Sequence, residues 1–499
     1  MISQMRVLVL VLSVLGLAAT EAPSSKQRQH WLEMFARAYY PGRSGQIMIV
    51  PKQGEFFVDR DPLYAFQHGS PWEYDTHIPL LLHGAPFVKK GVFKDVARQQ
   101  DVAPTIAAII GALPPATTTG HVLRNALAST HEAPRLVALI VMDAMRADYF
   151  AKHADVMPTL SRLKAEGAWF AETRVDYLPT ATSVGHATIG TGTDPGLHGQ
   201  VANNIYNRVA GKAQAAYDQL DPRELMAPTL ADNWNIATDG QAIIIGQGGA
   251  IRAAAGLVGH GACQVNGRKV ILASYSATDA GWESNPQCYT MSNALQGFNG
   301  KAVWEAAGGT WKGHDISSPT KFRASSLFLR FETDALLAVL EAEPIGADEI
   351  TDLVFVNIKG TDYVAHAHGS DSPEMVDTLA ELDRQMTKLV DLLNRKAGGR
   401  QPLIVMTADH GTPSTPLATG RHYTDEVTDL IHQKFDPQEK KLVQYFGDAA
   451  NAQIYVDRHR ADALKISLKD VATFLEAQGV VAAAFPESEV MQAAARLKR

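Results

Sequence analysis

The chain has 499 residues, of which 46% are hydrophobic and 20% are charged. This composition can form a large core and excludes an intrinsically disordered chain. The formal net charge is −7, and the sequence has no basic run and no basic patch interleaved with aromatic residues, which argues against nucleic acid as a partner.

The first 22 residues have the pattern of a secretory signal peptide. Arg6 precedes an apolar run over residues 7–18, and small residues follow as far as Ala22. The run is shorter than a helix that spans a bilayer. We therefore expect cleavage and a periplasmic or secreted protein whose mature chain has no stable membrane insertion. An uncleaved membrane anchor is the alternative.

The sequence contains two cysteines, Cys263 and Cys288. In an exported protein they can form a disulfide that closes a modest loop, and two free buried thiols are the alternative. The sequence alone does not decide between these two states.

Predicted strands and helices alternate along the chain. Apolar runs predict strands at residues 46–51, 78–82, 136–142, 241–246, 353–358, 403–406 and 452–456. Amphipathic or capped patterns predict helices at residues 101–111, 157–165, 325–342, 373–393 and 468–477. In the first of these helices Asp101 suits the N-cap and Gly111 the C-terminal end. This alternation predicts an α/β fold with three α/β/α layers around a largely parallel sheet.

Three of the predicted strands are followed by carboxylates. The polar residues after these strands are Asp143, the pair Asp362 and His366, and the pair Asp409 and His410. Open α/β proteins place their chemistry at the edge where parallel strands end. A mixture of Asp and His suits Zn²⁺, although Mn²⁺ and iron also accept such ligands. Asp143, taken alone, could instead cap a helix.

Hydroxyl side chains cluster between Tyr177 and Asn204, just ahead of a predicted helix. A hydroxyl at a helix N-terminus lies at the positive end of the helix dipole. Coordination to a metal would further favour its alkoxide form and make it a nucleophile. The pattern does not single out one hydroxyl, and a capped turn rich in Ser and Thr is the structural alternative.

Five short motifs together resemble the alkaline phosphatase superfamily. They are Val141–Asp143, Thr182–Gly192, Asp194–Gly199, Asp362–His366 and Asp409–Gly411. The resemblance is to the phosphodiesterase/nucleotide pyrophosphatase branch and to a related branch of periplasmic alkaline phosphatases, and it covers most of residues 135–460. Each motif alone would be weak evidence.

The resemblance implies a hydrolase with two zinc ions. By position, Thr182 matches the nucleophile, which also binds metal, and the neighbouring Ser183 and Thr180 are its rivals. Asn203 matches the residue that binds a phosphoryl oxygen. One zinc would be held by Asp143, Asp409 and His410, and the other by Asp362, His366 and a further histidine. We read His186, His198 and His368 as structural or supporting residues, because the family does not use their positions as ligands.

The further histidine is missing from its expected place near the C-terminus. In the family it lies in a His-Gly loop that precedes a strand and a helix, and this pattern occurs here upstream, from His68 to the helix that begins at Asp101. We therefore expect a circular permutation, in which residues 23–128 complete a main catalytic domain over residues 129–499. The Pro- and Thr-rich stretch from residue 114 to about 133 would be the new junction. His68 is the expected ligand, with His77 and His422 as alternatives.

The permutation has a spatial consequence. The region of residues 468–486, near the end of the chain, should end close to residues 40–50 in space. Permutation is tolerated where natural termini lie close together on a surface.

One departure from the resembling phosphatases concerns the substrate. They have a Lys-x-Arg pair that binds phosphoryl oxygens, whereas here Arg252 fits the arginine and Ala250 stands at the lysine position. A dianionic monoester has more charge to neutralise than a monoanionic diester, so this loss favours a diester or another singly charged ester. Arg252 could also be an ordinary surface residue.

We expect residues 249–299 to form a cap over the site.

The predicted function is hydrolysis of small phosphate esters by a phosphodiesterase-like enzyme or alkaline phosphatase. Two Zn²⁺ ions would activate Thr182, which attacks phosphorus to form a phospho-threonine that water then hydrolyses. Sulfate or phosphonate ester hydrolysis is an alternative, as is an inactive metal-binding protein of the same fold. No cysteine lies near Thr182 to supply the modified nucleophile of many sulfatases. The oligomeric state is not indicated.

Overall fold

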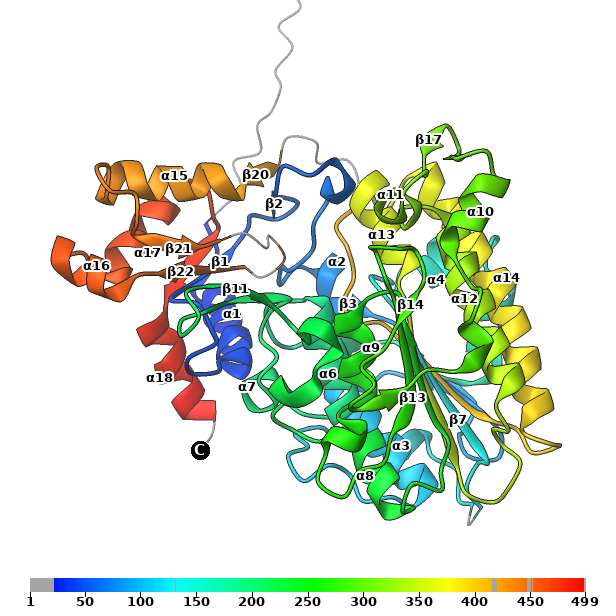
Figure 1. Ribbon diagram of the computed structural model, residues 1–499. Helices are drawn as coiled ribbons and strands as arrows, with labels where there is room; N and C mark the ends of the chain where they lie inside the picture. Colours follow the sequence, from blue (N-terminus) through cyan, green and yellow to red (C-terminus); the bar gives the residue numbers. More distant parts are fainter. Residues whose placement is uncertain (1–21, 131, 415–419, 447–449, 451, 498–499) are drawn as a thin grey trace, which may run out of the picture.

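The computed structural model describes residues 22–497, except residues 131, 415–419, 447–449 and 451. The predicted signal peptide thus lies outside the described residues apart from Ala22. Within the described part, no helix is long and apolar enough to cross a membrane. Figure 1 shows a large sheet covered by helices on both faces, with a smaller sheet and its helices beside it.

The large sheet has ten strands and a parallel centre. Nine of them follow the order β14 (Trp282–Glu283), β13 (Val270–Tyr275), β12 (Ile244–Gly248), β18 (Asp352–Ile358), β7 (Leu136–Met142), β19 (Leu403–Thr407), β4 (Leu80–His83), β8 (Ala168–Phe170) and β5 (Gly91–Phe93). The tenth, β15 (Tyr289–Thr290), pairs with β13. Strands β13, β12, β18, β7 and β19 are mutually parallel, and β4 joins them antiparallel to β19. The predicted α/β fold with a largely parallel sheet is confirmed.

Alternate residues of the central strands face two different helical layers. In β7, Ala138, Ile140 and Met142 pack in a cluster with α5 (Pro158–Glu166), α12 (Ser326–Ala342) and α14 (Pro373–Lys396). Val137, Leu139 and Val141 pack in the opposite cluster with α3 (Val102–Ile110), α6 (Thr182–Thr191), α8 (Leu230–Ala237) and α9 (Ile251–Val258). Burial on both faces explains why these strands read as continuous apolar runs.

The smaller sheet joins the two ends of the chain. Its order is β21 (Val443–Tyr445), β22 (Gln453–Val456), β1 (Ile47–Val50) and β23 (Ala483–Pro486). β1 pairs antiparallel with β23, with Ile47 opposite Pro486. The expected proximity of residues 40–50 to the end of the 468–486 region is therefore observed. Helices α1 (Ser25–Ala38), α15 (Thr424–Phe435), α16 (Arg458–Leu464), α17 (Leu468–Ala477) and α18 (Glu487–Leu497) accompany this sheet (Figure 1).

Two local predictions need correction. The run 78–82 forms two strands, β3 (His77–Ile78) and β4, with Pro79 between them. Asp101 precedes α3, but its side chain does not cap that helix. Its carboxylate instead accepts hydrogen bonds from the backbone N–H groups of Arg98, three residues earlier, and of His121, where the chain returns.

The segment 249–299 is not simply a cap. Its strands β13, β14 and β15 extend the large sheet, and α9 lies against α6. The elements that rise beside the sheet's carboxyl edge come later in the chain, as α10 (Gly300–Ala306), β16 (Thr310–Trp311), β17 (His314–Asp315) and α11 (Pro319–Phe322) (Figure 1). In the same region Cys263 and Cys288 form a disulfide, which decides between the two states that the sequence left open.

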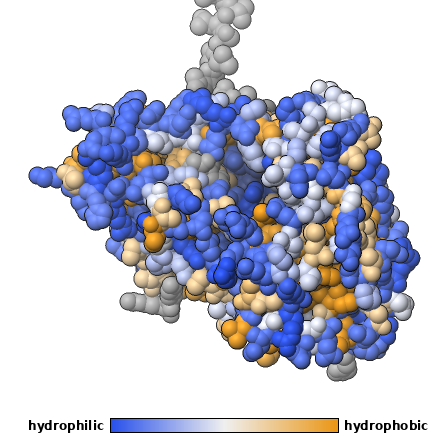
Figure 2. All heavy atoms as spheres, in the orientation of Figure 1, coloured by the Kyte–Doolittle hydropathy of each residue, from blue (hydrophilic) through white to orange (hydrophobic). Residues whose placement is uncertain are grey.

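Polar side chains cover most of the face seen in Figure 2. Large exposed hydrophobic residues, such as Leu113, Val209 and Val265, come from separate segments of the chain. Single exposed hydrophobic residues of this kind are normal for a folded protein.

Candidate active site

The carboxyl edge of the central strands brings three carboxylates together. Asp143 follows β7 and donates its backbone N–H to Ile358 at the end of β18. Asp362 lies on α13 (Gly360–His368), the helix that follows β18, and Asp409 follows β19. All three side chains are buried. They meet because β7 pairs in parallel with both β18 and β19.

Three histidines direct Nε2 toward these carboxylates, while Nδ1 of each ring is bonded to a backbone carbonyl. Nδ1 of His68, His366 and His410 lies 2.7–2.8 Å from the backbone carbonyls of Thr180, Phe66 and Gly411, respectively. A carbonyl only accepts, so Nδ1 carries the proton in each ring and Nε2 keeps a free lone pair. Such hydrogen bonds from the far nitrogen are the usual support of a metal-binding histidine.

These residues form two groups, which we name by their origin. The loop-completed group consists of Asp362, His366 and His68, and the sheet-edge group consists of Asp143, Asp409 and His410. Nε2 of His68 lies 3.7 Å and Nε2 of His366 3.3 Å from Oδ1 of Asp362. Nε2 of His410 lies 3.2 Å from Oδ2 of Asp409 and 3.6 Å from Oδ1 of Asp143.

The donor set fits divalent metal ions. The ligand atoms of His68, Asp362 and His366 all lie within 4.8 Å of one another, as do those of Asp143, Asp362 and His410. Within the described part of the chain, Oδ1 of Asp362, Oδ2 of Asp409 and Nε2 of His410 are buried without a hydrogen-bond partner. Buried polar atoms of this kind are normally satisfied, and a coordinated ion would satisfy them.

The loop that carries His68 is held by a buried carboxylate. Oδ2 of Asp75, on α2 (Glu73–Thr76), accepts hydrogen bonds from the backbone N–H and the hydroxyl of Ser70. Burial raises the pKa of Asp75 to about 7. Gly69 has φ +116°, and a Cβ there would lie 2.4 Å from the carbonyl oxygen of Ala450, so the turn requires glycine.

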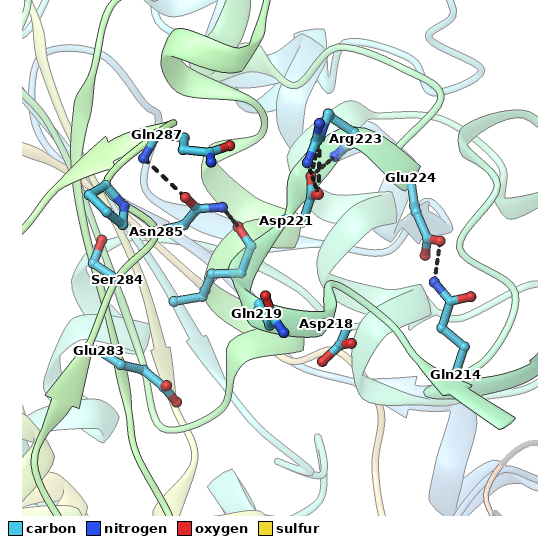
Figure 3. Close-up of a pocket in the computed structure, with 12 residues that line it drawn as sticks. Gln214, Asp218, Gln219, Asp221, Arg223, Glu224, Glu283, Ser284, Asn285 and Gln287 are labelled. Carbon is cyan, nitrogen blue, oxygen red and sulfur yellow. Dashed lines mark hydrogen bonds and ion pairs between the residues drawn. The ribbon is translucent and has the colours of Figure 1, made fainter.

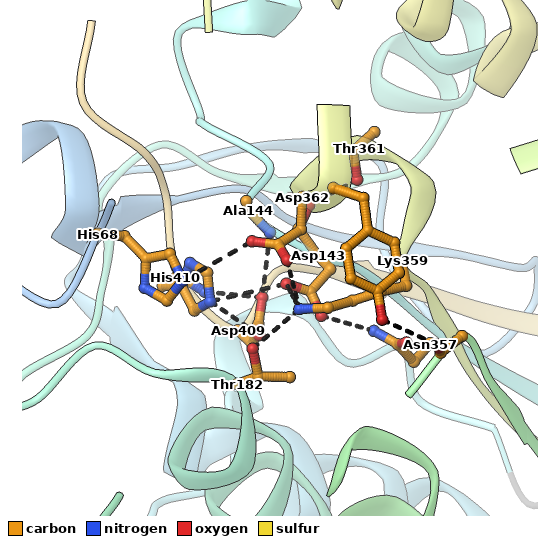
Figure 4. A network of polar contacts seen from close by, with 12 residues as sticks. His68, Asp143, Ala144, Thr182, Asn357, Lys359, Thr361, Asp362, Asp409 and His410 are labelled. Atoms are coloured by element: carbon orange, nitrogen blue, oxygen red, sulfur yellow. Dashed lines mark hydrogen bonds and ion pairs between the residues drawn. The ribbon is translucent and has the colours of Figure 1, made fainter. Parts of the chain in front are cut away.

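Thr182 is the first residue of α6 and is fully buried beside both groups. Its hydroxyl oxygen accepts a hydrogen bond of 2.9 Å from Nζ of Lys359. The rival hydroxyls have other partners, since Thr180 donates to the carbonyl of Ser70 and Ser183 to that of Ala202. Of the three candidate hydroxyls, that of Thr182 contacts Lys359 in the centre shown in Figure 4.

Asn203 lies beside the start of α6. Its Oδ1 accepts a hydrogen bond from the backbone N–H of Ser183, which fixes the side-chain amide beside the start of α6. Arg252 lies in the first turn of α9, and Ala250 immediately precedes that helix. The positive charge of Arg252 acts on Lys359 and on Tyr64, whose ring lies 5.0 Å from that of His366. Asn203 thus contacts the first turn of α6, and the charge of Arg252 acts on Lys359.

Lys359 is the residue that the sequence analysis missed. It separates β18 from α13, is fully buried, and places Nζ 2.9 Å from Oδ1 of Asp143 and 2.6 Å from Oδ2 of Asp362 (Figure 4). Burial acts to lower the pKa of Lys359, but these two carboxylates raise it above its ordinary value. A lysine directly after an apolar strand, three residues before Asp362, was the available signal.

Charge and burial shape the protonation states of the ligands. Burial lowers the pKa of His410 to about 4 and holds that of His68 well below its usual range. Burial and the charge of Asp143 raise the pKa of Asp409. Burial opposes ionisation of Asp362 too, yet His366 and Lys359 hold its pKa well below the ordinary value. Neutral imidazoles are the form that binds metal.

The alternative histidines lie elsewhere. His77 contacts the carbonyl of Ala171, and His422 pairs with Glu55. His186 touches Asp409, but its Nδ1 bonds to the carbonyl of Thr182 and its Nε2 accepts from Asn357.

The other two histidines near the motifs also have structural partners. His198 hydrogen-bonds to Thr188. His368 belongs to a separate cluster with His314 and Glu374.

A polar cavity of about 530 Å³ opens in a different part of the molecule (Figure 3). It is lined by residues of the ranges 214–224 and 283–287, among them the ion pair Asp221–Arg223. Its lining contains no member of either ligand group, so the buried centre, not this cavity, is the candidate active site.

Comparison with known proteins places the chain among phosphoric ester hydrolases. A model of the family described as "Type I phosphodiesterase / nucleotide pyrophosphatase" matches residues 137–496. The chain is 25% identical to the alkaline phosphatase PafA of Elizabethkingia meningoseptica over 406 residues, which cover 68% of this chain and 72% of that protein.

Two further relatives have similar identities. Alkaline phosphatase PhoV of Synechococcus elongatus is 25% identical, covering 70% of this chain and 73% of the relative. Venom phosphodiesterase of Macrovipera lebetinus is 24% identical and covers 58% of this chain but 27% of the relative.

A solved structure supports the fold. The crystal structure of wild-type PafA matches with a TM-score of 0.59 and 22% identity, covering 70% of this chain and 77% of that chain. The family match begins at residue 137, so the segment that carries His68 lies outside it.

Proposed function

The chain belongs to the type I phosphodiesterase / nucleotide pyrophosphatase family, within the alkaline phosphatase superfamily, and from this premise we propose that it hydrolyses small phosphate esters through a phospho-threonine formed at a two-metal centre. The single observation that carries the proposal is the buried hydroxyl of Thr182. This hydroxyl contacts Nζ of Lys359. The same Nζ contacts Asp143 and Asp362, one carboxylate from each ligand group.

The two ligand groups would hold the metal ions. Asp362, His366 and His68 would bind one, and Asp143, Asp409, His410 and the oxygen of Thr182 the other. When bound, divalent ions such as Zn²⁺ would favour the alkoxide of Thr182 and neutralise charge on the phosphoryl oxygens. The rings of His68 and His410, whose pKa values are lowered by burial, face inward with Nε2 and are ready for this role.

The reaction has two steps. In the first, Oγ1 of Thr182 loses its proton to solvent and forms a bond to phosphorus, while the bond from phosphorus to the leaving oxygen breaks. The leaving oxygen keeps the electron pair and takes a proton from solvent. In the second, water attacks phosphorus, the bond to Oγ1 breaks, and one proton of that water passes to Oγ1. Asn203 would orient the phosphoryl group by donating a hydrogen bond to one of its oxygens, and Arg252, whose positive charge acts on Lys359, would assist.

The protein's own groups prepare this site. Thr182 begins α6, so the N-terminal dipole of a buried helix favours negative charge on its oxygen. Gly185, one turn further along, allows the helix to approach the metal-binding loop, because a Cβ there would lie 2.7 Å from the Cβ of Asp409. The centre is buried, which strengthens each electrostatic contact.

The proposal is tested by trapping the intermediate. Zinc-loaded wild-type protein, mixed with 4-nitrophenyl phosphate and quenched in acid, should carry a phosphate on the peptide that contains Thr182, detected by mass spectrometry. Thr182→Ala should bind zinc, form no phosphopeptide and lose at least about 10⁴-fold in kcat. Thr180→Ala is the matched control and should keep the phosphopeptide. Turnover by Thr182→Ala at the wild-type rate would exclude this mechanism.

We also propose that residues 23–128 are a permuted segment that completes the catalytic domain. This is supported by β4, which pairs with β19 inside the large sheet, and by Gln99, whose amide donates to the carbonyls of Ala408 and Asp409. A chain re-permuted to begin at residue 134, with residues 23–128 attached after residue 497, should fold with the same zinc content.

Export remains a prediction, and N-terminal sequencing of protein secreted from its host would test cleavage near Ala22.

A further inference from the structure

We propose that Lys359 is a catalytic residue of this centre, a fixed cation that holds the attacking oxygen and favours a dianionic phosphate monoester as substrate. The inference rests on the proposed function, because it assumes that Thr182 attacks phosphorus. It adds to that function a residue outside the metal-binding motifs and a preferred substrate class.

The position of the ammonium is the first support. Nζ of Lys359 contacts the hydroxyl oxygen of Thr182 and one carboxylate from each ligand group, all at 2.6–2.9 Å. The side chain is fully buried. Taking an ammonium out of water has a large free-energy cost unless it is paired, and here its partners are the reacting atom and the ligands themselves.

The surrounding structure fixes the lysine from its backbone outward. Glu332, on α12, accepts hydrogen bonds from the backbone N–H groups of Lys359 and Gly360, at 3.1 and 2.8 Å. Gly249 lies against the stem of the side chain, since a Cβ at Gly249 would come within 2.5 Å of the Cβ of Lys359. The ammonium is therefore aimed at Thr182 before any substrate arrives, which is the preorganisation that electrostatic catalysis requires.

The chemistry of the contact follows from its donors. A charged lysine has three N–H donors and no acceptor, so it stabilises negative charge on Oγ1 but does not remove its proton. Once Oγ1 is bonded to phosphorus, the unesterified phosphoryl oxygens are the next acceptors within reach of the same ammonium. Lys359 thus acts on the charge of the nucleophile and of the transferred group.

The substrate preference follows from the neighbouring strand. β12 pairs in parallel with β18, with Gly248 opposite Asn357, so the ends of these two strands are adjacent. Ala250, just beyond β12, carries no charge, and Lys359, just beyond β18, supplies one. A dianionic phosphoryl group gains more from an added cation than a monoanionic one. This reverses the preference for diesters that Ala250 alone indicated.

The test measures, for each variant, the activity on a monoester and on a diester and the affinity for zinc. Lys359→Met removes the charge but keeps the length of the side chain, and Lys359→Arg keeps the charge. Lys388→Met makes the first substitution at an exposed lysine, 3.2 Å from Asp334, and is the matched control. For each protein we would measure kcat/KM for 4-nitrophenyl phosphate and for methyl 4-nitrophenyl phosphate. Zinc affinity of the metal-free protein would be measured by competition with a chelator.

We expect Lys359→Met to lose about 10²-fold on the monoester and less than about tenfold on the diester. Its zinc affinity should rise by about tenfold or more, because the ammonium no longer opposes a cation beside Asp143 and Asp362. Lys359→Arg should keep the preference for the monoester, and Lys388→Met should match wild type. Equal losses on both esters, or a zinc affinity that is unchanged or lower, would overturn the proposal.

Folding is controlled for in the same experiment. If Lys359→Met folds only when zinc is present, the proposal is supported, because zinc then supplies the missing charge. Failure to fold with or without zinc overturns it and assigns the lysine a structural role. The proposed function would fail on a different result, namely turnover by Thr182→Ala at the wild-type rate. The zinc titration of the Lys359 variants tests the lysine independently of that result, because it does not depend on turnover.

Discussion

The two ligand groups reach one centre by different routes. Asp143, Asp409 and His410 follow directly after β7 and β19, two adjacent parallel strands, so their positions are set by the sheet. In the loop-completed group, Asp362 and His366 lie one turn apart on α13, but His68 comes from a loop far upstream. That loop depends on Asp75, Gly69 and the carbonyl of Thr180. Regular structure builds one half of the centre, and tertiary contacts complete the other.

Metal removal should have the largest effect, because it empties both groups. Dialysis of the protein against a chelator should reduce activity on 4-nitrophenyl phosphate to background and lower the thermal unfolding temperature. Bound ligands stabilise the folded state, so added Zn²⁺ should restore both. Two ions per chain are expected by elemental analysis. Full activity after verified loss of metal would contradict the two-metal centre.

The next largest effect is expected within the sheet-edge group. Asp409→Asn removes a charge from the buried set, and kcat should fall by roughly 10³-fold. Because β7 and β19 hold the remaining ligands, zinc content should drop to about one ion per chain while circular dichroism stays native. Asp425→Asn, at an exposed carboxylate on α15, is the control. Retention of both ions by Asp409→Asn would remove Asp409 from the ligand set.

A smaller effect is expected from the loop-completed group. His68→Ala leaves Asp362 and His366 in place on α13, so we expect zinc affinity at this site to fall by more than about 100-fold and activity to recover partly at high zinc. His77→Ala, near the same loop but bonded to Ala171, should keep wild-type zinc binding. If His77→Ala loses the ion and His68→Ala does not, our choice of ligand is wrong.

The smallest effect concerns the support of the His68 loop. The folded pKa of Asp75 is about 7, above its ordinary value of 3.8, so between these values the folded state binds more protons than the unfolded state. Its contribution to stability is therefore most favourable at and below about pH 4 and declines as pH rises to 7, by at most about 1.4 kcal/mol per pH unit. Asp75→Asn keeps an oxygen for Ser70 without the charge, and should flatten this decline. The measurement is denaturant unfolding of metal-free protein at several pH values, and curves parallel to wild type would contradict it.

Much of the fold could be predicted because its signals are local. The runs at 136–142 and 353–358 became β7 and β18, since strands buried on both faces are apolar throughout. The prediction failed where a distant segment intervened. Asp101 looked like a helix cap but binds Arg98 and His121 instead, and the segment 249–299 contributes strands to the sheet because β13 pairs with β12.

Sequence patterns located the sheet-edge residues, because each follows a strand and its position is a property of that strand. The sequence restricted the nucleophile to Thr182, Ser183 and Thr180. It also restricted the remaining ligand to a few histidines. Only the tertiary structure placed His68 rather than His77 or His422 beside Asp362, since that choice depends on a loop packed across the sheet edge.

Lys359 shows the same limit. Its place after β18 was visible in the sequence, but its contact with Thr182 was not, because the side chain reaches across the centre between elements that are far apart in the chain. Local patterns report which residues end a strand. The folded structure decides which of those residues a side chain meets.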